Sequence, residues 1–292
     1  MKRHCWLGWA LPFPRTGCTP RRTATVVDLL HRAAMATIVM TGSAGGMGVA
    51  TRARLEGDGH RVIGVDVRDA DVIADLSTDA GRRDMVTAVT TAAPEGLDGL
   101  VAGAGITGPD APAVVSINYF GAIATLRDLR PLLGRRGNAS AVAISGNSTT
   151  TFPDVPMALV DACLADDEEA ARAAAEGIDP IAAYPATKLA LARWVRRRAT
   201  SAEWIGAGIR LNAVAPGLIS TPMTAGMEQA VLGLGEIYPI PQGRAGRAEE
   251  IAALLAFLLS PDAGFFCGSV VFVDGGTDAA LRAEDWPSRA DG

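Results

Sequence analysis

The chain has 292 residues with 49% hydrophobic and 20% charged content, a formal net charge of −5 and an isoelectric point near 5.3. This acidic balance offers no basic footprint for nucleic acid, and the sequence has no run of about 18 apolar residues that would span a membrane. A chain of this size can bury one sizeable core, so we expect a single domain whose partner is a small molecule.

The histidines and cysteines exclude further classes of protein. The only histidines are His4, His31 and His60, all early in the chain, so a Ser-His-Asp hydrolase would lack its base. The four cysteines have no Cys-x-x-Cys spacing and no histidine cluster beside them, so we predict that the protein binds no metal. We expect these cysteines to be reduced thiols of a cytoplasmic protein.

The two ends of the chain differ from its middle. Residues 1–34 mix tryptophans, prolines and arginines, and their short apolar stretch is interrupted at Pro12 and Pro14, which is not the pattern of a signal peptide. We predict a disordered extension over 1–34, one folded domain over 35–280 and a loose tail over 281–292.

A strand-like segment at 36–40 opens the folded pattern and runs directly into the glycine-rich loop Thr41–Gly48, after which a helical pattern begins. Three glycines of this loop leave the backbone free to turn tightly, to approach a pyrophosphate and to pack a helix on a strand. The helix N-terminus adds free N–H groups and a positive dipole that favour a phosphate. A flexible turn is the alternative, but the strand and helix on either side favour a dinucleotide site.

The next strand-like segment, 61–66, ends in Asp66, roughly 20 residues beyond the glycine loop. In a doubly wound sheet this position holds the carboxylate that accepts hydrogen bonds from the adenosine ribose. Asp66 therefore favours NAD, because NADP needs a cation for its 2′-phosphate and the glycine loop has none. Arg68, shortly after it, keeps NADP open as the alternative, and a simple turn cap is the structural alternative for Asp66.

Tyr184 and Lys188 stand in the pattern Tyr-Pro-Ala-Thr-Lys, and Lys188 is the only lysine after Lys2 in a chain that otherwise uses arginine. On a helix the two side chains would share a face, and an ammonium beside a phenol favours the ionised phenol. Lysine is a compact point charge that fits beside a phenol and beneath a sugar diol, unlike the planar arginine fork. The pattern indicates a tyrosine that acts as a general acid and base.

Five motifs occur in order, and together they make the chain similar to the short-chain dehydrogenase/reductase family over residues 36–278. The motifs are Thr41-Gly-x-x-x-Gly-x-Gly48, Asp75-Leu76, Ile117-Asn118-Tyr119, Tyr184-x-x-x-Lys188, and Pro216-Gly217 after a strand-like segment at 209–215. Within the family, the segment 64–77 and the long stretch before Tyr184 most resemble the NAD-dependent 3α-hydroxysteroid dehydrogenase/carbonyl reductase type. The resemblance implies an α/β fold with a Rossmann-type doubly wound parallel sheet in a single domain, and NAD as the cofactor.

The resemblance also implies which residues form the site. Tyr184 would exchange a proton with the substrate, Lys188 would hold the nicotinamide ribose and lower the pKa of Tyr184, and Asn118 would position a water that relays the proton. The cofactor-binding residues that it implies are Gly42, Ser43, Gly46, Met47, Gly48, Asp66, Asp75, Leu76, Gly103, Tyr184, Lys188, Pro216, Gly217, Ile219 and Thr221.

The chain departs from the family pattern in two places. The usual Asn-Asn-Ala-Gly stretch reads Ala-Gly-Ala-Gly at 102–105, and the catalytic serine that normally follows an Ile-Ser pair is replaced by Gly146. Ser145 should face the opposite side of the strand, whereas Ser148 returns to the same side if the chain stays extended. We therefore predict that Ser148 supplies the missing hydroxyl. The alternatives are that Ser148 only caps the following loop, or that no serine polarises the substrate carbonyl.

Two variable regions set the chain apart within the family. Between Thr149 and Tyr184 the chain is longer than the roughly dozen residues that the family needs, and helical patterns at 156–164 and 167–176 predict two short helices. We expect this insertion to change how subunits associate, with a purely structural flap as the equal alternative. The apolar, methionine-bearing stretch 221–243 predicts a lid for a hydrophobic substrate, with packing into the core as the alternative.

A helical pattern at 248–259 and a strand-like segment at 269–273 complete the domain. The sequence thus predicts an NAD-dependent oxidoreductase that interconverts a secondary alcohol and a ketone, assembled as a homodimer or homotetramer. We expect a hydrophobic, steroid-like substrate, with a cyclic diol or a small ketone as the alternative. A nicotinamide-dinucleotide-binding protein with low turnover is the alternative from another class, because the usual serine position is Gly146.

Overall fold

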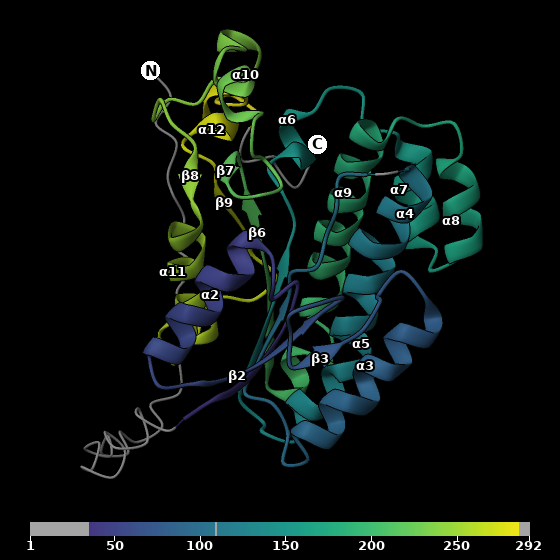
Figure 1. Ribbon diagram of the computed structural model, residues 1–292, viewed down its shortest axis with the longest axis vertical. Helices are drawn as coiled ribbons and strands as arrows, with labels where there is room; N and C mark the ends of the chain where they lie inside the picture. Colours follow the sequence, from purple (N-terminus) through teal and green to yellow (C-terminus); the bar gives the residue numbers. More distant parts are fainter. Residues whose placement is uncertain (1–34, 109, 286–292) are drawn as a thin grey trace, which may run out of the picture. The chain divides into compact units, whose positions relative to one another are not determined.

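The computed structural model describes residues 35–108 and 110–285. The predicted extension over 1–34 and residues 286–292 of the predicted tail lie outside the described residues. The main sheet consists of β1 (Thr37–Thr41), β2 (Arg61–Asp66), β3 (Val72–Ile73), β4 (Gly99–Ala102), β5 (Ala139–Ile144), β6 (Ile209–Pro216) and β9 (Val270–Val273). These seven strands are parallel and lie in the order β3-β2-β1-β4-β5-β6-β9 (Figure 1). The short strands β7 (Ile219–Ser220) and β8 (Gly246–Arg247) form a second sheet.

The central strands are buried along their whole length and are mostly apolar, although Arg210 and Asn212 of β6 are buried polar residues. Every residue of β5 and β6 is buried, as near-continuous apolar runs require in a parallel sheet that is covered on both faces. The edge strands β3 and β9 are only partly buried. The core therefore lies on both sides of β1, β4, β5 and β6.

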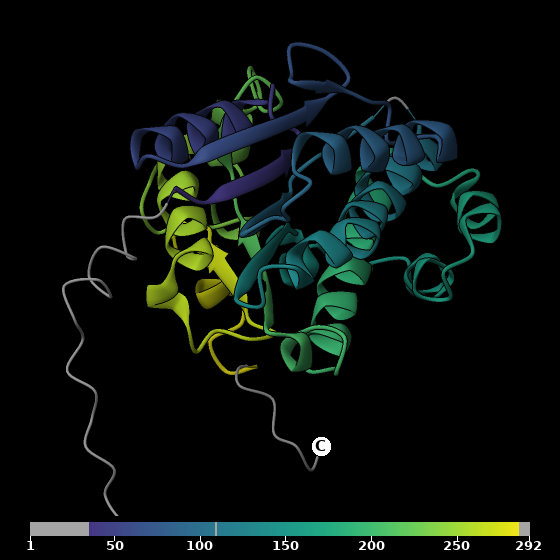
Figure 2. The ribbon, with the colours of Figure 1, turned by 90° about the horizontal axis from the view of Figure 1, so that it is seen from below.

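Helices cover both faces of the sheet (Figure 2). On one face lie α2 (Gly46–Gly57) and α11 (Ala248–Leu259), and on the other α3 (Asp79–Ala92), α5 (Ala122–Gly134) and α9 (Pro180–Ala199). Side chains of β1 divide between the two cores, since Ile38 and Met40 pack in the core with residues of α2 and α11, and Val39 packs in the core on the opposite face. This arrangement confirms the predicted doubly wound α/β fold.

The insertion forms the two short helices that the sequence predicted. They are α7 (Met157–Leu164) and α8 (Glu168–Ala175), which pack against each other, against α9 and against α4 (Ala111–Val115). The remaining helical elements are the π-helix η2 (Ser116–Gly121), α6 (Ser148–Thr151), α10 (Glu228–Leu232), α12 (Thr277–Leu281) and the 3₁₀ turns η3 (Ile205–Ala207), η4 (Gly235–Ile237) and η5 (Pro261–Ala263).

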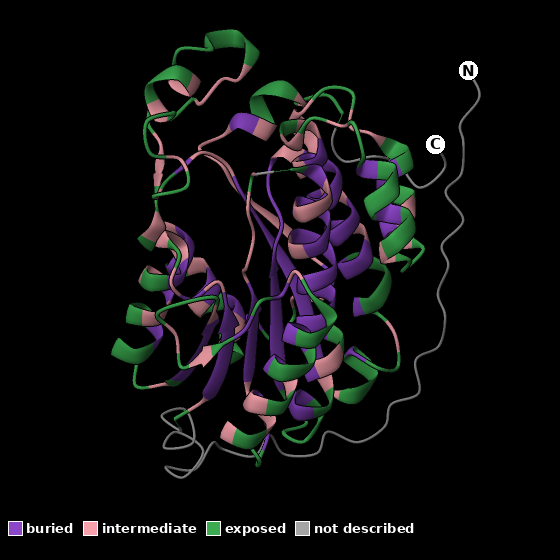
Figure 3. Cartoon of the chain, turned by 45° about the vertical axis from the view of Figure 1, so that its right-hand side comes forward, coloured by how far each residue is buried: buried purple, intermediate pink, exposed green. Residues whose placement is uncertain are grey.

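The apolar stretch 221–243 does not pack into the core. Met223, Met227 and Leu234 are between 44% and 47% exposed, and Ile237 is 78% exposed, so the alternative of core packing is wrong (Figure 3). Because no strand of the main sheet comes from this stretch, its apolar side chains stay at the surface. Across the described residues, we find no helix with the length and apolar character that crossing a membrane would need.

The strand order reverses at β1, with β2 and β3 on one side and β4, β5, β6 and β9 on the other. In such sheets the ligand crevice opens at the carboxyl ends of the strands beside this reversal. Thr41 ends β1 there, and its hydroxyl accepts hydrogen bonds from the N–H groups of Gly103 at 3.2 Å and Ala104 at 3.3 Å. This hydroxyl holds β1 to the loop after β4, where the family's usual asparagines are absent.

Candidate active site

A cavity of about 390 Å³ opens at the reversal of the strand order. The residues from the predicted cofactor set that line it are Gly42, Gly46, Met47, Gly48, Asp66, Asp75, Leu76, Gly103 and Thr221. They come from the glycine loop, the end of β2, the segment after β3, the loop after β4 and the segment after β7. The fold thus brings together residues that are far apart in the sequence.

The glycine loop has no space for side chains at its key positions. Gly42 has a φ of +75°, and a Cβ on Gly48 would lie 2.1 Å from the carbonyl oxygen of Gly42. A Cβ on Gly46 would lie 2.9 Å from side-chain atoms of Thr221 and Pro222. No side chain caps the first turn of α2, so its N–H groups remain open toward the loop. These features fit the pyrophosphate of a dinucleotide.

Asp66 lies at the wall of this cavity, as predicted, but its carboxylate also organises the loops. Its Oδ2 accepts a hydrogen bond from the N–H of Ala44 at 3.0 Å, and its Oδ1 accepts one from the N–H of Val67 at 2.8 Å. Arg68 lines the same cavity. Both the carboxylate that favours NAD and the cation that would suit NADP are therefore present.

Besides Tyr184 and Lys188, four residues of the predicted cofactor set do not line this cavity. Ser43 is buried, with its Oγ 2.7 Å from the point where a Cβ on Gly64 would stand. Pro216 is the last residue of β6, and a Cβ on Gly217 would meet Asp274.

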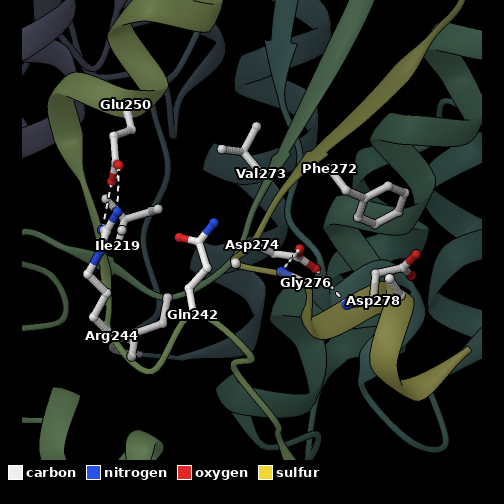
Figure 4. Close-up of a pocket in the computed structure, with 13 residues that line it drawn as sticks. Ile219, Gln242, Arg244, Glu250, Phe272, Val273, Asp274, Gly276 and Asp278 are labelled. Atoms are coloured by element: carbon white, nitrogen blue, oxygen red, sulfur yellow. Dashed lines mark hydrogen bonds and ion pairs between the residues drawn. The ribbon is translucent and has the colours of Figure 1, made fainter.

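The fourth, Ile219, is buried and lines a second cavity of about 470 Å³, which Figure 4 shows. Its neighbours there include Gln242, Arg244 and Glu250. Ile219 belongs to β7, which pairs with β8, and it packs in the same apolar cluster as Met47 of the glycine loop.

Tyr184 and Lys188 lie together on α9, one turn apart. The Nζ atom of Lys188 is 5.5 Å from the centre of the Tyr184 ring and donates a hydrogen bond to the carbonyl oxygen of Ile144 at 2.9 Å. A Cβ on Gly105, which lines the first cavity, would stand 3.3 Å from this Nζ and 3.2 Å from Oδ1 of Asn118. Lys188 and Asn118 thus lie immediately behind the cavity wall.

The pKa values of this pair differ from the expectation. Burial, followed by the nearby phenol of Tyr238, raises the pKa of Tyr184 to about 12, and burial lowers the pKa of Lys188 to about 8. Burial disfavours the charged form of each group, and the ammonium lies over the ring rather than paired with the hydroxyl. In the protein without cofactor, the phenol therefore keeps its proton at neutral pH.

Asn118 lies on the π-helix η2 and uses its whole side-chain amide to hold one residue. Its Oδ1 accepts from the N–H of Ile106 at 2.8 Å, and its Nδ2 donates to the carbonyl oxygen of the same residue at 2.9 Å. Ile106 lines the first cavity. Asn118 therefore fixes the cavity wall, a contact that its sequence motif alone did not predict.

The hydroxyl oxygens of Ser148 and Tyr184 both lie close to Gly146. A Cβ on Gly146 would lie 3.4 Å from Oγ of Ser148 and 3.6 Å from Oη of Tyr184. Oγ of Ser148 is buried and has no hydrogen-bond partner among the described residues, whereas Oγ of Ser145 donates to the carbonyl oxygen of Lys188 at 2.9 Å. The chain does not stay extended as expected, because α6 begins at Ser148, and this helical turn brings Ser148 beside Tyr184.

The segment before Ser148 is held by a contact that the sequence did not reveal. Both side-chain polar atoms of Asn147 bond to the hydroxyl of Tyr238, at 2.8 Å and 3.0 Å, and its Nδ2 lies 3.4 Å from Oδ2 of Asp274. Tyr238 belongs to the exposed stretch 221–243, where it was predicted only as an apolar lid residue. The hydrogen bond between Tyr238 and Asn147 could not be predicted from the sequence, because the two residues are far apart in the chain.

The segment after Ser148 is held by α12. Oγ1 of Thr150 donates to Oδ1 of Asp278 at 2.5 Å. The N–H of Asp278 donates to Oδ2 of Asp274 at 2.7 Å (Figure 4). α6 is therefore fixed on both sides of Ser148 by residues near the C-terminal end of the described chain.

Known proteins are similar to this chain over most of its length. The family model described as enoyl-(acyl carrier protein) reductase matches residues 170–278. The 3-alpha-hydroxysteroid dehydrogenase/carbonyl reductase of Comamonas testosteroni is 41% identical over 259 residues, covering 85% of this chain and 98% of the relative. The cyclohexanol dehydrogenase of Acinetobacter sp. strain SE19 is 30% identical over 250 residues, covering 81% of this chain and 92% of the relative.

A solved structure shares the fold. The 3-alpha-hydroxysteroid dehydrogenase from Pseudomonas sp. B-0831, complexed with NADH, is 41% identical and has a TM-score of 0.77. The match covers 85% of this chain and 99% of that structure.

Proposed function

The chain belongs to the short-chain dehydrogenase/reductase family and is an oxidoreductase, and we propose that it interconverts a secondary alcohol and a ketone on a hydrophobic, steroid-like substrate with NAD as cofactor. The observation that carries this proposal is that the Tyr184 and Ser148 hydroxyl groups both lie close to Gly146, while Lys188 of the same helix as Tyr184 lies immediately behind the dinucleotide cavity. Two neighbouring hydroxyl donors suit the single oxygen of a carbonyl or alcohol.

The proposed mechanism assigns one task to each residue. When bound, the nicotinamide supplies the acceptor or donor of hydride. Tyr184 gives its proton to the substrate oxygen during ketone reduction and takes it back as a phenolate during alcohol oxidation. Ser148 donates a hydrogen bond to the same oxygen. Lys188 holds the cofactor's ribose, and its charge favours the phenolate, while Asn118 fixes the wall of the cavity and lies on the path by which the proton leaves.

The pKa of Tyr184 predicts opposite pH behaviour for the two directions. With a pKa of about 12, the phenol is a proton donor throughout the neutral range. As long as the pH stays below the pKa, each increase of one pH unit raises the ionised fraction of the phenol about tenfold. We expect alcohol oxidation at saturating substrate to quicken from pH 6 to pH 8, the range in which Lys188, with a pKa of about 8, keeps at least about half of its charge, and ketone reduction not to quicken. Initial rates in both directions test this, and a flat oxidation profile would contradict it.

The substrate class follows from the surface beside the cavity. Met223 lines the cavity and is 46% exposed, and the neighbouring side chains of the stretch 221–243 are also apolar and exposed. Flexible, polarizable methionine adapts well to a large apolar ligand. The names of the two curated relatives, one acting on a hydroxysteroid and one on cyclohexanol, support a cyclic secondary alcohol.

Asp66 is proposed to select NAD over NADP, because its carboxylate would repel a 2′-phosphate and accept from a 2′-hydroxyl. We expect NAD to bind at least about tenfold more tightly than NADP, and Asp66→Ala to narrow that ratio mainly by weakening NAD binding. Titration of both dinucleotides measures the ratio, with Asp84→Ala, an exposed position on α3, as the control. Equal affinities in the unsubstituted protein would refute the assignment to NAD.

A second function is favoured by one observation, the glycine at position 146. If Ser148 does not replace the missing serine, the protein would bind the dinucleotide but turn over substrates poorly. Tight NAD binding without turnover of any secondary alcohol in a broad panel would favour this function over the first.

A further inference from the structure

One buried arginine of α3 binds the first residue of the inserted helix α8. Arg82 on α3 is only 7% exposed, and its guanidinium binds both carboxylate oxygens of Glu168, the first residue of α8. The distances are 2.5 Å from NH1 to Oε2 and 2.8 Å from NH2 to Oε1. This is the paired geometry in which a guanidinium and a carboxylate bind most strongly.

The other donors of Arg82 hold two backbone carbonyl groups. Its Nε donates to the carbonyl oxygen of Leu76 at 2.8 Å, and its NH2 group donates to the carbonyl oxygen of Ser116 at 3.2 Å. Another arginine, Arg172 on α8, donates to the Ser116 hydroxyl at 2.6 Å. The side chain of Arg82 therefore links the insertion to the segment after β3 and to the start of η2.

Both carbonyl groups belong to the framework of the dinucleotide cavity. Leu76 lines the cavity, and Ser116 directly precedes Ile117, which also lines it. A Cβ on Gly121, at the end of η2, would lie 3.1 Å from Cβ of Leu76, so the two segments are tightly packed against each other. A shift of either carbonyl group would therefore move the cavity wall, and with it the π-helix that carries Asn118.

Glu168 is the partner that keeps Arg82 in place. The other carboxylate near the guanidinium, Asp79, has a side chain that is 78% exposed and contacts only NH1, at 3.2 Å. Burial alone would raise the pKa of Glu168, but the hydrogen bonds from Arg82 and Ser116 outweigh burial and hold that pKa below its ordinary value. A buried guanidinium that loses its counterion is strongly disfavoured, so loss of the Glu168 charge would displace Arg82.

We propose that the inserted helices α7 and α8 support the cofactor cavity, and that Glu168 is a positioning residue that acts through Arg82 on Leu76 and Ser116. The insertion thereby gains a role in cofactor affinity, although none of its residues lines the cavity. This inference rests on the proposed function, in which the cavity binds a nicotinamide dinucleotide.

The first test is Glu168→Gln in the full chain, which keeps the size of the side chain and removes its charge. We expect the Kd for NADH, measured by fluorescence titration, to rise about tenfold, and the KM for NAD to rise with it. The KM for the alcohol and kcat at saturating NAD should stay within about twofold. The matched control is Glu169→Gln, the exposed neighbour on the same helix, which should leave all four quantities unchanged.

A double variant separates support of the cavity from simple stabilisation. Arg82→Met with Glu168→Met removes both charges, and replacing a buried ion pair by apolar side chains is often neutral for stability. We expect its thermal unfolding midpoint to fall by no more than that of Glu168→Gln, because no unpaired charge remains buried and only the two carbonyl groups lose their donor, while NADH binding stays weakened.

Three results would overturn the inference. They are unchanged NADH affinity in Glu168→Gln, unchanged NADH affinity in a folded double variant, and affinities that follow the unfolding midpoint across all variants, which would mean a purely structural flap. If the unsubstituted chain binds no dinucleotide, the proposed function itself fails and this inference with it.

Discussion

Tyr184→Phe is expected to lower the turnover of a secondary alcohol by at least about 100-fold while dinucleotide binding is retained. The substitution removes the phenolic oxygen that lies close to Gly146, as Oγ of Ser148 also does, and general acid–base catalysis typically contributes a factor of this size. The ring remains, so the packing of α9 changes little. Steady-state kinetics with NAD, together with NADH titration, measure the two effects separately.

A second tyrosine of the chain, Tyr119, provides the control for this substitution. Tyr119→Phe makes the same chemical change at a side chain that is buried in the core, and it should alter turnover by less than about threefold. Near-full activity of Tyr184→Phe would remove tyrosine from the mechanism, and equal losses in both variants would point to a general effect on folding.

Ser148→Ala is expected to lower turnover by about 100-fold, because a hydrogen-bond donor aimed at the reacting oxygen typically contributes a factor of this order. Ser145→Ala should cost far less, since that hydroxyl is bound to the carbonyl oxygen of Lys188. The decisive variant is Gly146→Ser combined with Ser148→Ala. Position 146 leaves ordinary contact distances of 3.4 Å and 3.6 Å for a Cβ, so a serine fits there and should restore most of the lost activity.

The results of these substitutions show which serine, if either, donates the hydrogen bond to the substrate oxygen. A larger loss in Ser145→Ala than in Ser148→Ala would assign the hydroxyl to residue 145. No loss in either variant would mean that Tyr184 works alone, and the dinucleotide-binding function with low turnover would then gain support. A double variant that remains as inactive as Ser148→Ala would show that the loss came from disturbing α6 rather than from removing a donor.

The regular parts of the fold were predictable because their signals are local. β2 and α11 begin and end at the predicted residues. The apolar run of β2 is bounded by charged residues, and the ends of α11 can be recognised from its long helical periodicity. The glycine loop was equally readable, because only glycine fits where a Cβ would meet backbone atoms.

The parts that could not be predicted depend on partners that are distant in the sequence. The contact between Asn147 and Tyr238 joins residues 91 positions apart, and the pair of Arg82 and Glu168 spans 86 positions. The pKa of Tyr184 was expected to be lowered by its neighbour on the helix, but burial, which the sequence does not show, raises it to about 12. The position of Ser148 was inferred from strand alternation, whereas a turn of helix brings it to the site.

The anchoring of α6 by α12 determines the order in which a newly made chain can become active. Residues 37–118 already contain the glycine loop and most of the cavity wall, so the nucleotide half can assemble while synthesis continues. The segment around Ser148 is anchored only when Asp274 and Asp278 meet Asn147 and Thr150, and these partners lie 127 and 128 positions apart in the chain. A nascent chain that stops short of α12 therefore holds its dinucleotide framework while α6 is still unanchored.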